Sequence, residues 1–232
     1  ATDLSLTDFT FWIGFAAMFA ATLFFFNAMN LVADKWKTSM LVSALITAIA
    51  ALHYYYMRNA AMEGDITTAY RYVDWILTVP LMCVEFYLLT RAAGATKSLL
   101  WKLIIASVWM LVAGYIGESF NPEGGDTAHS VKWGVISTIG YIYILYTAWF
   151  GEVAQLAEKS NSEVVKKGVR TLAWFVLVGW AIYPIGYMCM EGGWLSSVMS
   201  PSDVDLWYNI ADAINKIGFG LVVYNIAVTE SK

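Results

Sequence analysis

Long apolar stretches, each about as long as a bilayer is thick, follow one another along the chain. The hydrocarbon core of a membrane needs roughly 20 predominantly apolar residues per helix. Short polar connectors separate the stretches, and none shows the apolar–polar alternation of membrane-barrel strands. The pattern predicts an all-α membrane protein, a bundle of seven transmembrane helices that forms a single domain over residues 1–232. The expected helices lie at about 8–32, 37–58, 67–91, 98–117, 131–156, 165–190 and 203–229.

Basic residues outside the apolar centres are unevenly distributed between the two sides of this bundle. Arg58 and Lys132 fall on one side, and ten fall on the other. Lysine and arginine accumulate on the cytoplasmic side of membrane proteins. The bias predicts an N-terminus outside the cell and a C-terminus in the cytoplasm. The ten residues are Lys35, Lys37, Arg91, Lys97, Lys102, Lys159, Lys166, Lys167, Arg170 and Lys232.

Composition agrees with a membrane as solvent. Of the 232 residues, 59% are hydrophobic and 14% are charged, whereas soluble domains carry about 25% charged residues. The net charge of −4 comes without a basic stripe, so no nucleic-acid partner is expected. Cys83 and Cys189 lie in apolar runs and are interpreted as small buried hydrophobes, with no metal site expected. No basic region precedes the first apolar run, so no cleavable signal peptide is predicted.

Five charged residues lie well inside the predicted helices, where a charge costs at least about 2.5–3.5 kcal/mol. One interpretation is a structural ion-pair network that joins two helices. Buried ionisable groups in membranes more often mark a path for protons or ions, and we favour this second interpretation. The five are Arg71, Asp74 and Glu85 on the third helix, and Asp212 and Lys216 on the seventh.

Spacing orders these groups along the bundle. Arg71, Asp74 and Thr78 lie at i, i+3 and i+7 and share one face of the third helix. Glu85 follows Asp74 by eleven residues, so it shares that face roughly 16 Å further along the axis. Asp212 and Lys216 are one turn apart on the seventh helix. A lysine in this place, converted to an imine with an aldehyde cofactor, could carry a proton whose affinity the cofactor controls.

Three segments carry a resemblance to a known family. RYVDWILTVPLMCVE (71–85) resembles the third helix of microbial rhodopsins, WAIYP (180–184) is similar to their sixth helix, and DAINKIGFG (212–220) resembles their retinal-binding seventh helix. The resemblance covers all seven expected helices in order. Asp74, Thr78 and Glu85 match the pattern of proteorhodopsin-type proton pumps. Sodium pumps of the family carry Asn-Asp-Gln instead, and chloride pumps lack the first acid.

The resemblance implies a role for each site residue. All-trans retinal is expected on Lys216 as a protonated Schiff base, with Asp74 as counter-ion and proton acceptor and Glu85 as proton donor. Asp212 is the implied second counter-ion, and Arg71 is expected to stabilise the anions. His53 and Thr78 are the implied partners of the acceptor, although a lone membrane histidine is more often a packed hydrogen-bonding residue. The implied pocket consists of Tyr72, Trp75, Met82, Trp180, Tyr183, Pro184 and Tyr187, and an apolar Met82 implies green absorption.

The resemblance leaves the roles of two acids and one glycine undecided. Glu191 is the acid near the sixth-to-seventh connection, where archaeal pumps have a glutamate pair, but its register is off by one. Glu118 resembles a proteorhodopsin motif and is expected to act structurally or at a protomer interface. Gly134 aligns with a glycine of carotenoid-binding relatives, so it is interpreted either as a window for an antenna carotenoid or as close helix packing. Relatives form pentamers or trimers, which implies a homo-oligomer.

Together these features predict a light-driven outward proton pump in the cell (inner) membrane of a bacterium, and no enzyme. The main alternative is a photosensor of the same fold that signals to a partner, against which the retained Glu85 argues. A light-gated channel would need further polar residues along a pore. A receptor or transporter without retinal would leave the Asp212–Lys216 pair unexplained.

Overall fold

The structure is a computed structural model that describes residues 5–63, 67–122 and 125–232. These residues form helices and no strands, which confirms the predicted all-α class. Seven helical spans in them are long and apolar enough to cross a membrane. The elements are α1 (Leu6–Ala28), α2 (Asp34–Glu63), α3 (Thr68–Thr90), η1 (Arg91–Ala93), α4 (Lys97–Ser119), α5 (Thr127–Trp149), α6 (Glu152–Lys159), α7 (Glu163–Trp174), η2 (Phe175–Gly179), α8 (Ile182–Cys189) and α9 (Pro201–Thr229).

Two of the spans are interrupted, which the hydrophobic pattern did not indicate. The fifth consists of α5 and α6, and the break falls at Phe150 and Gly151, whose amides both bond to the Tyr146 carbonyl. The sixth consists of α7, η2 and α8. Element bounds also differ from the expected ranges by several residues, most at α2, which continues to Glu63.

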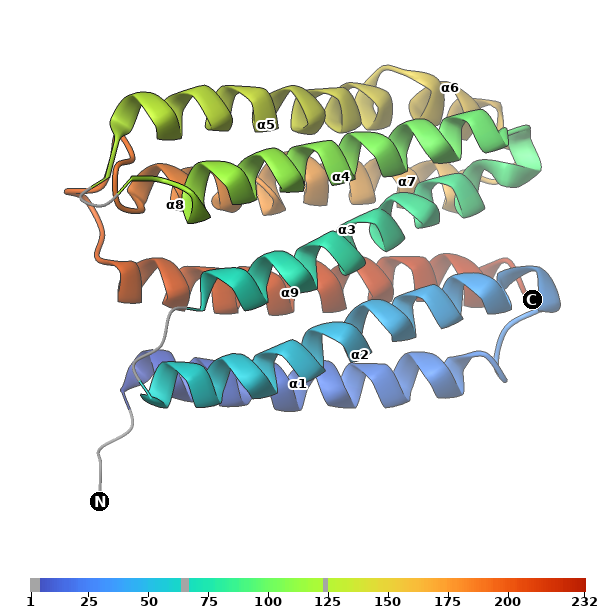
Figure 1. Cartoon of the computed structure of the whole chain (residues 1–232). Coiled ribbons are helices and arrows are strands. Elements are labelled where there is room, and N and C mark those ends of the chain that lie inside the picture. Colours follow the sequence, from blue (N-terminus) through green and yellow to red (C-terminus); the bar gives the residue numbers. More distant parts are fainter. Residues whose placement is uncertain (1–4, 64–66, 123–124) are drawn as a thin grey trace.

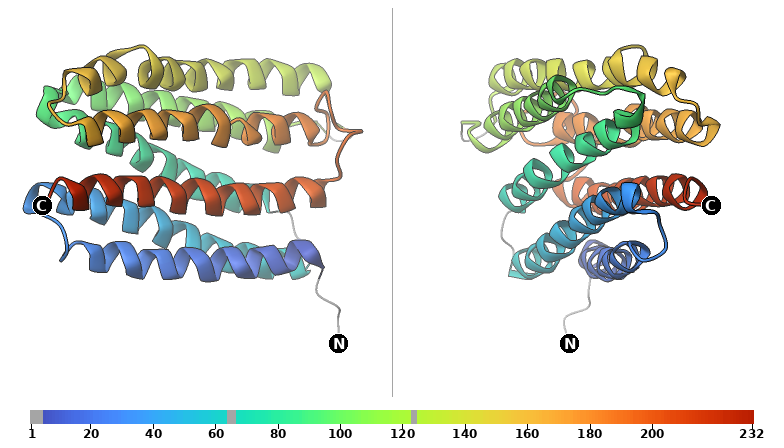
Figure 2. Two further views of the ribbon diagram at one scale, coloured as in Figure 1. Left: turned by 180° about the vertical axis from the view of Figure 1, so that it is seen from behind. Right: turned by 90° about the vertical axis from the view of Figure 1, so that its right-hand side faces the viewer.

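The helices run side by side along one axis, and α9 is central among them (Figure 1). Seen from behind, α9 lies between α1 on one side and α7 with α8 on the other (Figure 2). It also contacts α2. One face of α9 is packed against these helices, and the polar residues Asn209, Asp212 and Lys216 on it are buried.

Two contacts define the ends of the bundle. At one end the hydroxyls of Thr7 and Ser202, at the starts of α1 and α9, lie 3.1 Å apart. We call this the Asp205 end, after the acid in the first turns of α9. At the other end the Ala33 amide donates to Ser231 Oγ over 2.7 Å. We call this the Glu85 end, because α3 carries that residue towards it.

Many large apolar side chains face the outside of the bundle, while several charged side chains are buried in its interior. Val178 is 62% exposed and Ile214 is 61% exposed, whereas Asp74 and Lys216 are buried. A protein in water would arrange these residues the other way round. The distribution is the one that lipid favours, because an unpaired charge facing hydrocarbon is expensive.

The π-helical turn η2 lies within the sixth span. The Trp180 amide bonds to the carbonyl of Phe175, five residues earlier, over 2.9 Å. Tyr141 Oη donates to the Val176 carbonyl (2.8 Å), and Asn215 Nδ2 donates to the Gly179 carbonyl (2.8 Å). A π-turn leaves carbonyls without helical partners, and side chains from α5 and α9 satisfy them here. The turn is therefore held by neighbouring helices.

Candidate functional site

A lysine amine lies between two carboxylates in the middle of the bundle. Lys216 Nζ is 2.9 Å from Asp212 Oδ1, one turn earlier on α9, and 3.1 Å from Asp74 Oδ2 on α3. The lysine side chain is 3% exposed and both carboxylates are fully buried. Burying charges is costly unless they pair well. The structure thus brings together the three residues that the spacing grouped.

The two carboxylates differ in their hydrogen bonds. Besides the lysine, Asp212 accepts hydrogen bonds from Tyr54 Oη (2.8 Å), Tyr183 Oη (2.7 Å) and Trp75 Nε1 (3.2 Å). Among the described residues, Asp74 receives no hydrogen bond at either carboxylate oxygen apart from its ion pair. Hydrogen bonds to a carboxylate stabilise its charged form. Asp212 is fixed from several sides, whereas Asp74 keeps oxygen atoms that can take a proton.

The two implied partners of Asp74 contact backbone atoms. Thr78 Oγ1 donates to the carbonyl oxygen of Asp74 over 2.9 Å. His53 Nδ1 lies 2.8 Å from the carbonyl oxygen of Ile49, which leaves Nε2 as the other ring nitrogen. No hydrogen bond joins either side chain to the Asp74 carboxylate in the parts of the chain that are described. Their partnership with this carboxylate stays a prediction.

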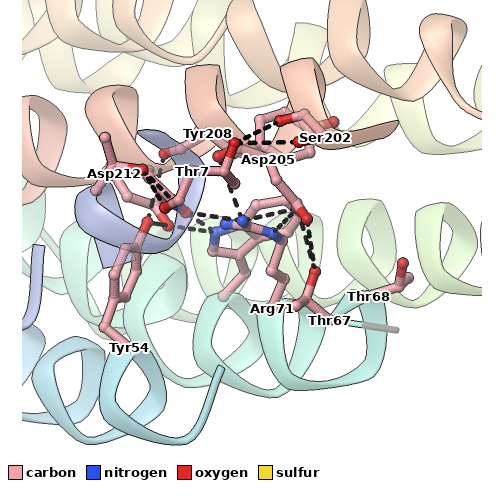
Figure 3. A network of polar contacts seen from close by, with 12 residues as sticks. Thr7, Tyr54, Thr67, Thr68, Arg71, Ser202, Asp205, Tyr208 and Asp212 are labelled. Carbon is pink, nitrogen blue, oxygen red and sulfur yellow. Dashed lines mark hydrogen bonds and ion pairs between the residues drawn. The ribbon is translucent and has the colours of Figure 1, made fainter. Parts of the chain in front are cut away.

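Arg71 makes its ion pair and hydrogen bonds with Asp205 and Asn209, and in the described residues none of them joins it to Asp74 or Asp212. Its Nη2 is 2.8 Å from Asp205 Oδ1, and its Nε donates to the same oxygen over 3.0 Å. Nη2 also donates to Asn209 Oδ1 over 2.7 Å. The guanidinium lies over the ring of Tyr208, 5.3 Å from its centroid. Figure 3 shows this cluster between α3 and α9.

Glu85 occupies a different environment on α3. It is fully buried, and Ser43 Oγ donates to its Oε1 over a long 3.3 Å. No polar partner of Oε2 is found within the described ranges. Phe86 and Phe219 belong to the apolar cluster that fills this end of the bundle. The residue is therefore a nearly isolated carboxyl group in apolar surroundings.

A cavity of about 200 Å³ adjoins Lys216. All seven residues of the implied pocket line it, together with Gly134 and other mostly apolar side chains. Lys216 supplies the one amine among the lining residues that the structure describes. Retinal is an apolar aldehyde, so an apolar cavity with an amine in its wall fits it. The pocket residues are Tyr72, Trp75, Met82, Trp180, Tyr183, Pro184 and Tyr187.

Gly134 lies in the wall of this cavity on α5. A methyl group at this position would come within 2.9 Å of the Tyr187 ring. Tyr187 is fixed in turn, because its hydroxyl donates to the Ser130 carbonyl over 2.7 Å. The glycine therefore permits close packing of α5 against Tyr187 beside the cavity.

Glu118 and Glu191, the two acids whose roles the sequence left undecided, lie near the Asp205 end. Glu118 accepts hydrogen bonds from Tyr72 Oη (3.0 Å) and Thr68 Oγ1 (3.2 Å), so it ties α4 to α3 beside the cavity. Glu191 is exposed, and its carbonyl accepts a hydrogen bond from Asn121. These contacts favour a structural role for Glu118.

Several site residues were not singled out in the sequence. Tyr54 follows His53 directly, and Asn215 precedes Lys216. Asp205 lies seven residues before Asp212, which places both on one face of α9. That spacing was a signal available in the sequence, whereas nothing local indicated that Tyr54 would reach Asp212 from another helix.

A buried lysine between two aspartates, beside an apolar cavity in a seven-helix membrane bundle, defines the class of protein. The chain matches the family described as bacteriorhodopsin-like protein over residues 5–230, and it belongs to this family. Membership implies retinal bound to a lysine. It also places the chain among transport and photoreceptor proteins rather than enzymes.

Relatives and solved structures agree over nearly the whole chain. It is 42% identical to the green-light absorbing proteorhodopsin of Gamma-proteobacterium EBAC31A08, over 99% of this chain and 90% of that protein. The crystal structure of Exiguobacterium sibiricum rhodopsin covers 97% of each chain at 37% identity, with a TM-score of 0.85. Xanthorhodopsin, described as a light-driven ion pump with dual chromophore, covers 98% of this chain and 94% of its own at 32% identity, with a TM-score of 0.84. The chain is a multi-pass bacterial membrane protein.

Proposed function

We propose that this protein is a light-driven pump that moves protons from the cytoplasm to the outside, with retinal bound covalently to Lys216. The observation that carries the proposal is the Lys216 amine, held 3.1 Å from Asp74 and 2.9 Å from Asp212 beside the apolar cavity. The similarity to a proteorhodopsin supports it. Side chains from α3, α4, α5, α8 and α9 line the same cavity, which supports a single retinal-binding domain over residues 1–232.

Retinal, when bound, would supply a light-driven change in the position and proton affinity of the lysine nitrogen. Asp74 Oδ2 is the oxygen placed to take the proton, because it lies nearest to Nζ on α3 and no competing donor occupies it. Asp212 remains charged through the transfer, since three other side chains donate to it. The second ring nitrogen of His53 is the proposed partner of the protonated acceptor.

Glu85 is the proposed source of the replacement proton. Glu85 is a buried carboxyl whose polar contacts are the serine hydroxyls of Ser43 and Ser39, and such a group is most stable with its proton attached. It lies on the opposite side of the lysine from Arg71 along α3, so protons arrive from one end of the bundle and leave at the other. The excess of basic residues near the Glu85 end assigns that end to the cytoplasm. Transport is therefore outward.

The proposal is tested with cells that express the protein and are supplied with retinal in unbuffered medium. Illumination should acidify the medium, and a protonophore should abolish the change. Lys216→Ala should remove both colour and acidification. Asp74→Asn should keep the colour and lose the acidification. A coloured wild-type protein that changes no pH would overturn the pump and point to a photosensor.

We also propose that the wall at Gly134 admits an antenna carotenoid. The position of a residue without a side chain in the cavity lining and the similarity to the dual-chromophore xanthorhodopsin support this. Adding a xanthophyll should create a new band in the excitation spectrum for pumping, and Gly134→Trp should remove that band while leaving retinal absorption in place. A spectrum without the band in the wild type would leave close packing as the role of this glycine.

Association of several copies in the membrane is a further part of the proposal. Large apolar side chains are exposed on the outer faces of the spans, so copies can meet there without exposing polar groups to lipid. Chemical cross-linking in native membranes should give a discrete oligomer. A monomer under these conditions would contradict it.

A further inference from the structure

Arg71 and Asp205 form a further ion pair among the described residues, apart from the one at Lys216. Arg71 is 3% exposed and Asp205 is 26% exposed, so the pair lies between the buried site and the surface at the Asp205 end. Two guanidinium nitrogens, Nε and Nη2, bond to the same carboxylate oxygen, Oδ1. Charge-assisted hydrogen bonds with this geometry are strong and directional. Arg71 is therefore fixed in one position.

Asp205 is itself held in place. Thr67 Oγ1 donates to Oδ1 over 3.1 Å and lies 3.3 Å from Oδ2. Asn209, one turn further along α9, accepts from Arg71 and donates to Thr10 Oγ1 over 3.0 Å. Figure 3 shows the guanidinium directed at Asp205, with Thr67 on the far side of the carboxylate. Contacts from α1, α3 and α9 thus define where the arginine lies.

The lysine site has one more negative than positive group, whereas Arg71 and Asp205 form a neutral pair. Lys216 faces two carboxylates, and Arg71 is the next cation along the bundle. If Arg71 turned inward, it would neutralise the excess negative charge beside the lysine. Charges at short range in a poorly polarisable interior interact strongly, so Arg71 needs an anion on its other side to remain where it is. Asp205 is the carboxylate that it contacts there.

We propose that Asp205 is a positioning residue for the proton-transfer site. By its ion pair, Asp205 holds Arg71 away from Asp74 and Asp212. The excess negative charge then remains beside the lysine, and Asp74 stays a strong proton acceptor. With Asp205 uncharged, Arg71 turns inward to the carboxylates of the buried site. This inference rests on the proposed pumping function.

The test compares Asp205→Asn with Asp205→Glu and with Asp203→Asn in the full-length, retinal-supplied protein. Asp203 is an exposed acid two residues away whose carboxylate bonds to Ser200, so it controls for charge loss at the same end of α9. Three properties are measured: the absorption maximum in the dark, the nitrogen-15 resonances of the Arg71 guanidinium, and the time at which protons appear outside after a flash.

Asp205→Asn should move the absorption maximum to longer wavelength. A cation nearer the lysine nitrogen raises the ground-state energy of a retinal pigment more than that of the excited state, because excitation moves positive charge away from the nitrogen. The Arg71 resonances should shift, and proton appearance should be delayed several-fold. Asp205→Glu should restore all three properties, and Asp203→Asn should resemble the wild type.

A lower melting temperature for Asp205→Asn with an unchanged spectrum and unchanged Arg71 resonances would overturn the inference, since it would show a merely structural ion pair. If that variant does not fold, Thr67→Val removes a donor to Asp205 while retaining every charge, and it should shift the spectrum in the same direction by less. If Asp205→Asn does not fold and the spectrum of Thr67→Val is not shifted, the inference is equally overturned. A wild type without colour or pumping would instead refute the proposed function.

Discussion

The two halves of the bundle on either side of Lys216 are built differently. Towards the Asp205 end, Asp212 has three side-chain donors besides the lysine, and Arg71 is tied to Asp205 and Asn209. Towards the Glu85 end, one carboxyl group has a 3.3 Å hydrogen bond from Ser43 and a further contact with Ser39, and the other surroundings are apolar. Both halves contain buried acids. The half towards the Asp205 end stabilises charged groups with hydrogen bonds, whereas the half towards the Glu85 end favours an uncharged carboxyl group.

The difference shows what each half must do. Charges that persist through a cycle need fixed partners, because reorganising them would cost energy at every turn. A group that stores a proton needs few partners, since burial without them favours the neutral form. Three predictions test this contrast, beginning with the largest expected effect.

Removing the acid from the half that supports charge should be strongly destabilising. Asp212→Leu leaves Lys216 with a single carboxylate and three donors without their acceptor. Breaking a buried ion pair in this way should lower the free energy of unfolding by about 3–5 kcal/mol. Chemical denaturation in detergent measures it. Asp203→Ala, at an exposed acid on the same helix, should cost only about 0.3–1.5 kcal/mol, because it removes the capping-box partner of the N-cap Ser200. Equal losses in the two variants would contradict the contrast.

The same kind of change in the apolar half should leave stability unchanged or raise it. Glu85→Leu replaces a poorly partnered carboxyl with an apolar side chain, and such replacements are often neutral or stabilising. Return of the proton to the site should nevertheless slow by about 10²–10⁴-fold, the usual contribution of a positioned acid. Flash photolysis measures the rate, and denaturation measures the stability. Glu85→Gln should match the slow rate, and a rate equal to the wild type in both variants would refute the donor role.

Single hydroxyl groups should show the contrast on a smaller scale. Tyr54→Phe removes a 2.8 Å bond to Asp212 and should cost about 1.5–3 kcal/mol, because the acceptor is charged. Ser43→Ala removes the 3.3 Å contact to Glu85 and should cost about 0.5–1.5 kcal/mol, as for neutral groups. Chemical denaturation of both variants in the same detergent gives their free energies of unfolding and shows which loss is larger. A larger loss for Ser43→Ala would mean that Glu85 carries charge in the dark.

The fold and the centre of the site were predictable for a physical reason. The length of each apolar run is set by the bilayer, so seven spans could be counted directly. Asp74 and Glu85 lie on α3, and Asp212 and Lys216 lie on α9. Spacing along one helix decides which residues share a face, and two such faces carry most of the site.

Contacts between helices were not predictable in the same way. Tyr54 reaches Asp212 across the bundle, and no spacing within α2 indicates which helix it faces. The sequence placed Arg71 on the face of Asp74, but its long side chain extends to Asp205 instead. Asp205 was detectable, since it lies two turns before Asp212, although only the structure shows that it competes for the arginine.

The π-turn at Phe175–Gly179 bears on how the length of the sixth span can change. A turn of this kind holds one residue more than an ordinary helical turn. Deleting a residue inside it would restore regular helix while both flanking segments keep their faces towards α5 and α9. The same deletion within Glu163–Trp174 would rotate everything on one side by roughly 100° and turn buried side chains to lipid. In this span, single-residue insertions and deletions among descendants of a common ancestor should therefore concentrate at these five positions.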